Sequence, residues 1–298
     1  MCGELKMKKQ TLVGIFGAVI LLSACSLSVG APGTPTPVDQ VGTIVAMTMQ
    51  ALTSSPGQNP ATPVQINGMP VSYENVSFVV PNGLATGANP EKMTAVDTNS
   101  GAPWDIAPTH LRFTLTGYPL QGKFSEPQIY VYPADEYAQV NSNASEQIGR
   151  LKKAVSGSPL LKETLPNVPF FNAEHILAAK LKLLNFQNGN GVRELTQYDQ
   201  YPAPVNNHEL FYHFEGLTSD DKYYVIAILP ITAPILAEDE KPESPVPAGG
   251  VPIPANTGPN EVYYISVTQK LSALSPENYT PSLNALDALV QSILIKTP

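Results

Sequence analysis

The chain has 298 residues, of which 14% are charged and 30 are prolines, and its formal net charge is −8. The charged share is well below the ~25% of ordinary globular proteins, and proline is about twice as frequent as usual. An acidic chain is repelled by nucleic acid and by anionic lipid headgroups. The composition therefore argues against nucleic-acid binding and against membrane attachment through a basic patch.

Residues 1–24 have the layout of a secretory signal peptide. Three lysines precede an uncharged apolar run from Leu12 to Leu22, which is about half of the roughly 20 residues that a membrane span needs. The run ends in the sequence Leu-Ser-Ala-Cys, which resembles the lipobox of bacterial lipoprotein signals. This resemblance implies cleavage between Ala24 and Cys25 and lipidation of Cys25. An ordinary cleaved signal with a chance cysteine is the alternative.

The lipid on Cys25 would make the membrane the first partner of this protein. Two or three acyl chains are enough for stable anchoring, so the expected location is the outward face of a cell membrane, in a periplasm or on a cell surface. The only other cysteine, Cys2, leaves with the signal peptide. We therefore expect no disulfide, no disulfide-linked partner and no cysteine metal site.

Residues 25–66 read as a tether that begins at the lipidated cysteine. Two stretches rich in Pro, Thr, Ser and Gly are expected to stay extended. Between them, Val38 to Leu52 carries apolar residues at the spacing of a short amphipathic helix. This helix is either a transient turn of a flexible stalk or a docking element for a partner or for the domain that follows.

Residues 67–298 are expected to form one globular domain with an acidic, proline-rich insertion at 237–260. Alternation and turn signals predict strands and hairpins, and capping and apolar spacing predict helices. The predicted strands are 71–80, 111–115, 128–132, 178–186, 192–198, 210–216 and 222–230. The predicted helices are one that begins with a capping box at Asn143 and Glu146, one over 259–274 and one that begins after Pro281.

This order of elements predicts an α+β fold with a mainly antiparallel sheet packed against helices, two of them C-terminal. Three segments resemble PsbP-type and LpqN-type lipoprotein domains: the strand that ends at Val79-Val80-Pro81, the hairpin 211–230 and the closing helix around 286–290. They cover about a third of the chain and contain no catalytic motif. The resemblance implies an αβα sandwich and an accessory or assembly role.

The sequence predicts no catalytic, cofactor-binding or metal-binding residue. It has no GxSxG, HExxH, GxGxxG or Walker motif. Structural or surface roles are expected for the four histidines, His110, His175, His208 and His213. Glu238 to Glu240 with Glu243 are either a solvated loop or a calcium site. Aromatic residues around the first strands fit a sugar or peptide site or the core: Trp104, Tyr118, Tyr130, Tyr132 and Tyr137.

Three functions fit these observations. The favoured one is a non-enzymatic lipoprotein that binds a partner protein or assists an envelope complex. The alternative is a receptor or carrier for a small lipid, glycan or peptide, and the third is an extracytoplasmic hydrolase that uses His208, His213 or acidic residues. A flat apolar patch would favour the first, an apolar groove the second, and converging histidines and carboxylates the third.

Overall fold

A computed structural model describes residues 66–99, 101–255 and 258–297. The predicted signal peptide, the predicted lipidation site Cys25 and the predicted amphipathic segment Val38–Leu52 lie outside the described residues. None of the helices in the described part is both long and apolar enough to cross a membrane.

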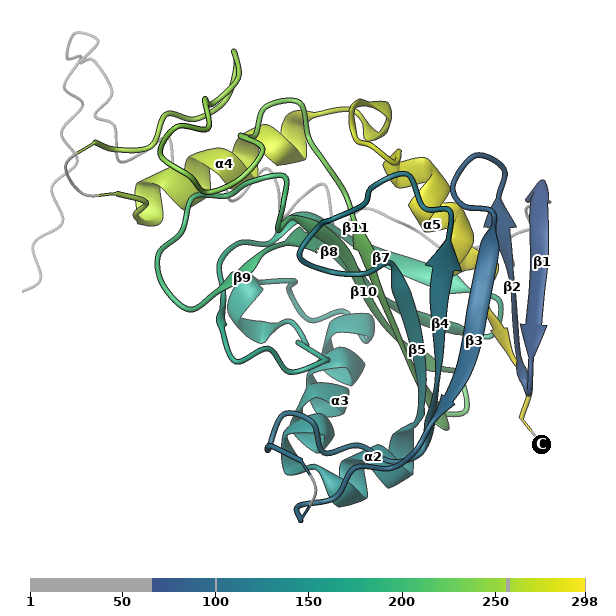
Figure 1. Ribbon diagram of the computed structural model, residues 1–298. Helices are drawn as coiled ribbons and strands as arrows, with labels where there is room; N and C mark the ends of the chain where they lie inside the picture. The colour runs from purple at the N-terminus through teal and green to yellow at the C-terminus, as the bar shows by residue number, and fades with distance from the viewer. Residues whose placement is uncertain (1–65, 100, 256–257, 298) are drawn as a thin grey trace, which may run out of the picture. The chain divides into compact units, whose positions relative to one another are not determined.

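The centre of the fold is a seven-stranded antiparallel sheet in the order β3-β4-β5-β11-β10-β8-β7 (Figure 1). Strand β11, which is almost entirely apolar, lies in the middle and is buried along nearly its whole length, as its sequence predicts. The strands are β3 (Gly87–Met93), β4 (His110–Thr116), β5 (Gln128–Pro133), β7 (Ala179–Phe186), β8 (Gly189–Thr196), β10 (Phe211–Thr218) and β11 (Tyr223–Pro230).

Helices α2 (Ala134–Val140) and α3 (Ser142–Val155) cover one face of this sheet (Figure 1). Leu151 of α3 is fully buried there, in a core that includes Phe211 and Ile226 of the sheet. Alternate residues of a strand point to opposite faces, so the neighbours Tyr212 and Phe214 contribute to a second core on the far side.

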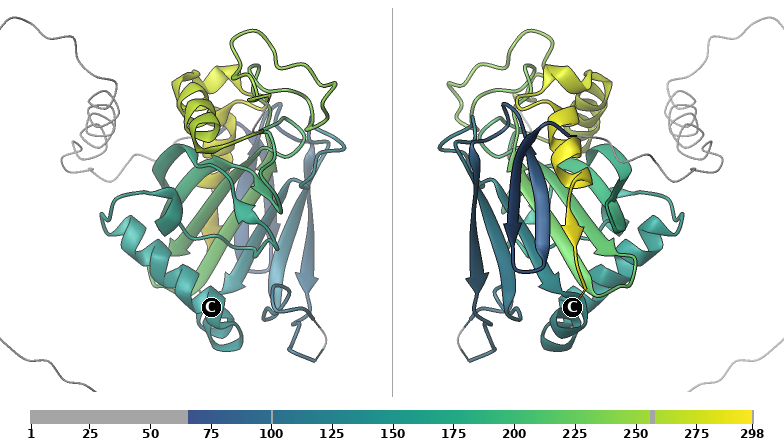
Figure 2. Two further views of the ribbon diagram at one scale, coloured as in Figure 1. Left: turned by 90° about the vertical axis from the view of Figure 1, so that its left-hand side faces the viewer. Right: turned by 90° about the vertical axis from the view of Figure 1, so that its right-hand side faces the viewer.

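The far side of the sheet is covered by α4 (Glu261–Ala273), α5 (Leu283–Gln291) and a small antiparallel sheet. The small sheet has the order β1-β2-β12, and Figure 2 shows its first hairpin beside α5. Its strands are β1 (Gly68–Tyr73), β2 (Val76–Pro81) and β12 (Leu294–Ile295). Elements therefore lie on both faces of the main sheet, and the predicted α+β class with two C-terminal helices is confirmed.

Two local predictions were wrong, and two elements were missed. The single strand expected over 71–80 is a hairpin, because Glu74 has a positive φ of 51° and turns the chain between β1 and β2. The capping box at Asn143 does not form, since the side chain of Asn141 caps α3 by accepting from the amides of residues 143 and 144. Glu146 instead pairs with Arg150 one turn later, at 2.8 Å. Strand β3 and helix α2 were not predicted at all.

Two short strands pair with each other next to the end of β8, beside the candidate functional site. Strand β6 (Glu174–His175) pairs with β9 (Tyr198–Asp199), so that Glu174 lies opposite Asp199 and His175 opposite Tyr198. Both β7 and β10 border β8, and β9 follows β8 directly. The described residues of the insertion after β11, 237–255 and 258–260, form turns and irregular chain. A bridge between Asn206 and Ala237 brings the start of the insertion close to this end of the sheet.

Candidate functional site

A pocket of about 290 Å³ opens beside β9. Four separate parts of the chain form it: the β4–β5 connection, the segment that leads into β6, the segment from β9 to β10, and the insertion. Its lining residues are Phe124, Phe171, Asn172, Ala173, Tyr198, Asp199, Gln200, Tyr201, Glu209 and Glu240. The volume is close to the lower end of the range for small-molecule sites.

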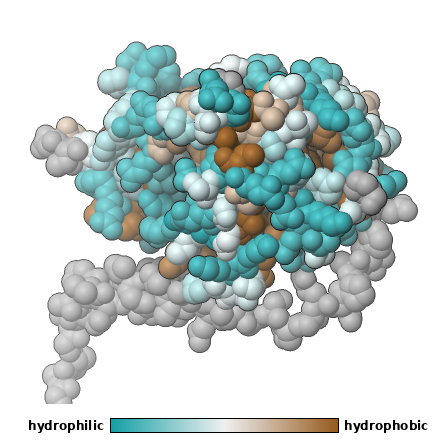
Figure 3. Space-filling view, turned by 90° about the horizontal axis from the view of Figure 1, so that it is seen from below, coloured by the Kyte–Doolittle hydropathy of each residue, from teal (hydrophilic) through white to brown (hydrophobic). Residues whose placement is uncertain are grey.

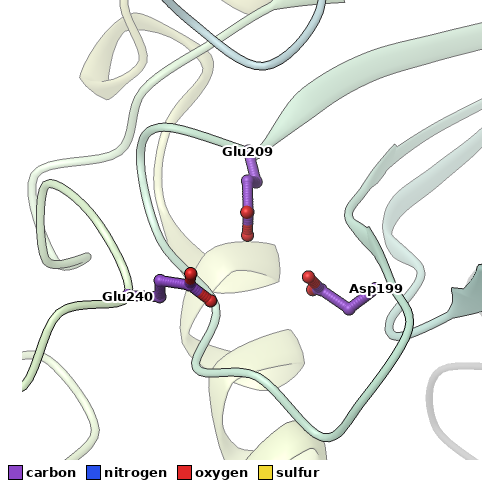
Figure 4. A group of neighbouring side chains, drawn as sticks. All are labelled: Asp199, Glu209 and Glu240. Atoms are coloured by element: carbon purple, nitrogen blue, oxygen red, sulfur yellow. The ribbon is translucent and has the colours of Figure 1, made fainter.

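Three carboxylates converge in this pocket, and Figure 4 shows them facing one another. Asp199 ends β9, Glu209 lies just before β10, and Glu240 belongs to the insertion. One oxygen of each lies within 4.8 Å of those of the other two. Asp199 is buried, Glu209 half-buried and Glu240 exposed, so the cluster spans the pocket from its floor to its rim.

Neutral amides hold two of these carboxylates in place. The Nε2 of Gln197 donates to Asp199 Oδ2 at 2.6 Å and to Glu209 Oε2 at 2.9 Å. The side chain of Asn206 accepts from the amide of residue 209 at 3.1 Å and donates to the Glu209 carboxylate at 2.8 Å. An Asn side chain that bonds the backbone two or three residues later is a turn-forming device, and here it sets the direction of Glu209.

The electrostatics of the cluster favour a positive occupant. Burial raises the pKa of Asp199 to about 6, and the charges of Glu209 and Glu240 add to this effect. Burial likewise raises the pKa of Glu209. Like charges that share a site oppose each other's ionisation, and the residues described as lining the pocket include no Lys, Arg or His. A bound cation would relieve this repulsion.

Four aromatic rings also line the pocket, those of Phe124, Phe171, Tyr198 and Tyr201. Phe124 is 55% exposed and Tyr201 is 54% exposed. The amide of Phe124 donates to the carbonyl of His208 at 2.9 Å, which holds this loop beside the carboxylates. Tyr201 donates its hydroxyl to Glu240, and the ring of Phe171 lies 4.6 Å from that of Tyr198.

Rings and carboxylates together suit an organic cation. The face of an aromatic ring attracts a cation, while a carboxylate pairs with an ammonium or guanidinium group. A hard divalent cation would use only the carboxylates and would leave the rings of Phe124 and Tyr201 without a role. From the acidic run considered in the sequence, the carboxylate cluster of the pocket includes only Glu240.

The side chains of Glu238, Asp239 and Glu240 in the insertion do not form one cluster in this structure. Glu238 pairs with Lys123 at 2.6 Å, and Asp239 pairs with Lys241 at 2.6 Å. Only Glu240 turns into the pocket. Its partners there are 41 and 31 residues earlier in the sequence, and no spacing rule connects positions 199, 209 and 240.

The aromatic residues that the sequence singled out lie elsewhere. Tyr118, Tyr132 and Tyr137 are buried in the two cores, which agrees with the core alternative. Trp104 is 46% exposed but does not line the pocket. The sequence did not predict the aromatic residues that do line the pocket, because nothing in their local sequence distinguishes Phe124 or Phe171 from core residues.

The histidines divide into two groups. His110 stacks on Tyr132 with ring centroids 4.3 Å apart, and His208 is half-buried beside the pocket. His175 and His213 both contact Glu194, at 3.1 and 3.3 Å. Converging histidines and carboxylates would favour a hydrolase, but the side chains of His213 and Glu194 are only 2% and 4% exposed and neither lines the pocket.

No family model matches the chain, and no curated protein and no solved structure matches it either. The resemblances to lipoprotein signals and to PsbP-type or LpqN-type domains therefore stay predictions.

Proposed function

We propose that this protein is a binding protein for a small organic cation, carries no catalytic activity, and is held at the outward face of a membrane by lipid on Cys25. The pocket beside β9 carries this proposal, because it combines exposed aromatic rings with three convergent carboxylates and lacks a cationic lining residue. The proposal thus follows the alternative of a small-ligand receptor or carrier.

The chemistry of the pocket narrows the ligand. Its aromatic and carboxylate groups recognise a positive charge on an apolar body, such as a quaternary ammonium or a short amine. A cation over an aromatic face contributes about 0.5–1 kcal/mol when exposed and about 2 kcal/mol when desolvated. A neutral ligand of the same shape would leave Asp199 and Glu209 facing each other uncompensated.

The pocket supports small-ligand binding better than attachment to a flat partner. The face of the domain seen in Figure 3 is mainly hydrophilic, and its apolar patches are small and separate. A partner protein that inserts a single Lys or Arg side chain would use the same chemistry as a free amine. We treat that arrangement as a distinct outcome of the test below.

The test is calorimetric titration of the full chain at pH 7.5 with choline and with its neutral isostere 3,3-dimethylbutan-1-ol. We expect saturable binding of choline, or of putrescine or arginine amide in parallel titrations, and no binding of the neutral alcohol. A cation at about one hundred times its Kd should also stabilise the fold by ~2.7 kcal/mol in thermal unfolding.

Two matched variants locate the site. Glu240→Gln removes one carboxylate from the pocket, whereas Glu238→Gln alters a residue of the same loop that pairs with Lys123 outside it. Affinity should fall about tenfold or more in the first variant and stay within twofold in the second.

Three results would contradict the proposal. Equal binding of choline and the neutral alcohol would show that the carboxylates are not used. Binding of calcium alone would make the cluster a metal site. If no small cation binds but a lysine-rich or arginine-rich peptide does, the result would support the function of a lipoprotein that binds a partner protein.

A further inference from the structure

One wall of the pocket is a segment that is attached to the main sheet at both ends. This wall segment, Val168 to His175, supplies Phe171, Asn172 and Ala173 to the lining. Between its ends it has little regular structure. The side chains that hold the ends come from β8 and β10 and lie in the core on the α3 side of the sheet.

The first end is held through its backbone. The carbonyl of Val168 accepts from His213 Nε2 at 2.9 Å, and the amide of Val168 donates to Glu215 Oε1 at 3.0 Å. Val168 is fully buried, and the side chains of His213 and Glu215 are 2% and 1% exposed. Two side chains of one strand therefore bind both backbone groups of one wall residue.

The second end is held by the same network. Glu194 of β8 lies opposite His213 of β10, and its two oxygens lie 3.3 Å from His213 Nδ1 and 3.1 Å from His175 Nε2. The ring of His175 stacks on Tyr198 of the pocket, with centroids 5.0 Å apart and an interplanar angle of 7°. His213 thus binds Val168 directly through a hydrogen bond. His175 reaches the network only through its ionic contact with Glu194, because its Nε2 makes no hydrogen bond within the described residues.

The hydrogen bonds define the protonation state of His213. A carbonyl only accepts, so Nε2 must carry a hydrogen to bind Val168; an ionised Glu194 only accepts, so Nδ1 must carry one as well. Both ring nitrogens then donate, and the ring is an imidazolium. Burial opposes this charge, but the hydrogen bond to Glu194 and the nearby Glu215 outweigh it and raise the pKa of His213.

Several other titratable groups surround the His213 ring, and they belong to the different elements that pack against it. Burial raises the pKa of Glu215 to about 7. Burial also acts on Glu194, but the two histidines outweigh it and lower the pKa of that carboxyl. The remaining groups are His175 of β6, Tyr198 of β9, Tyr224 of β11, Tyr137 of α2, and Lys162, which donates to the carbonyl of His175.

We propose that protonated His213 is a latch that keeps the wall segment on the sheet and so keeps the pocket formed. Loss of the proton would leave one ring nitrogen without a hydrogen, break the bond to Val168 or to Glu194, and place two buried carboxylates side by side without a cation. The wall segment would then open at alkaline pH. The latch would regulate the pocket to which we assign cation binding. The biological meaning of the latch therefore rests on the proposed function.

Hydrogen exchange of the full chain without ligand, followed by mass spectrometry from pH 6 to pH 9.5, tests the latch. Rates are corrected for the intrinsic pH dependence of exchange. We expect protection of the wall peptide to fall about tenfold or more over the alkaline part of this range, the size that loss of a charge-assisted hydrogen bond implies. Peptides from β4 should stay protected throughout.

Three variants make the result specific. In His213→Gln the amide can still donate to Val168 but does not titrate, so the loss of protection at alkaline pH should disappear and only a change near pH 7, from Glu215, should remain. In Glu194→Gln the imidazolium loses its carboxylate, so opening should move to lower pH. His110→Gln, which removes a histidine on β4 that contacts Pro108 and Tyr132, should behave as the unaltered chain.

Wall protection that does not change with pH would overturn the proposal, and so would an unchanged pH profile in His213→Gln. If that variant does not fold, an unmoved opening pH in Glu194→Gln overturns the proposal instead. The exchange experiment contains no ligand. Its failure would leave cation binding standing, and a failure of cation binding would leave the latch standing.

Discussion

The substitution Asp199→Asn should make the domain more stable at neutral pH while it removes cation binding. Asp199 is buried at the floor of the pocket, and its carboxylate faces Glu209 and Glu240. Ionising it in this place costs free energy in the folded chain but not in the unfolded chain. An asparagine of the same shape has no charge to bury, and its amide can donate to the remaining carboxylates.

The size of the effect follows from the pKa of Asp199, which rises from 3.8 to about 6 on folding. At about 1.4 kcal/mol for each pKa unit, this shift corresponds to about 3 kcal/mol for a group fully shielded from water. Asp199 borders an open pocket, so solvent screening reduces the expected gain to about 1–2 kcal/mol.

The sign of the pH dependence is fixed. An acid whose pKa is higher in the folded chain destabilises the fold above its folded pKa, and this penalty fades as the pH falls through 6 toward 4. Urea unfolding at pH 8 and at pH 4 measures it. The gain in Asp199→Asn should appear at pH 8 and shrink to less than half at pH 4.

The exposed Asp135 of α2 provides the control, since Asp135→Asn should change stability by less than about 0.5 kcal/mol. A stability gain in Asp199→Asn that is equal at both pH values would refute the reasoning, because repulsion between ionised carboxylates would not be its source. A loss of stability at pH 8 would refute it as well.

Three further outcomes are expected. Choline affinity should fall about tenfold between pH 7 and pH 5, because protons compete for Asp199 below its pKa of about 6; titration calorimetry that finds a constant Kd would contradict this. Asn141→Ala removes the cap of α3 and should cost ~1 kcal/mol in urea unfolding, with Asn143→Ala as the smaller control. Asp287→Asn leaves the buried Arg193 without its anion and should cost ~3–5 kcal/mol, so a loss below 1 kcal/mol would count against the ion pair.

The sequence could predict those parts of the fold that local rules determine. The hairpins β7–β8 and β10–β11 were predicted because each has a polar turn between two strand-like runs. Both hairpins form, although β8 begins at Gly189 and not at the predicted residue 192. The central place of β11 followed from its apolar composition. By contrast, β12 pairs with β2 across more than 200 residues, and no local pattern indicates such a contact.

The pocket could not be predicted for a related reason. Its carboxylates and rings come from distant segments, and each looks ordinary where it stands in the sequence. The calcium alternative for Glu238 to Glu240 pointed to the right loop, but only Glu240 reaches the cluster. The chemical role of such a carboxylate depends on the hydrogen-bond donors and charges that surround it in the fold. A comparison of Asp199 with Asp287 illustrates this dependence.

Both aspartates are buried, and both accept hydrogen bonds, yet their surroundings give them opposite roles. Asp287 binds Arg193 at 3.2 Å and Lys182 at 2.9 Å and accepts from Tyr212, so its charge is neutralised within the protein. Within the described part of the chain, the carboxylate of Asp199 accepts a hydrogen bond only from the neutral side-chain amide of Gln197. An amide orients a carboxylate without neutralising it. The negative charge of the pocket is therefore held in position but left unbalanced, and a cation from outside the domain can balance it.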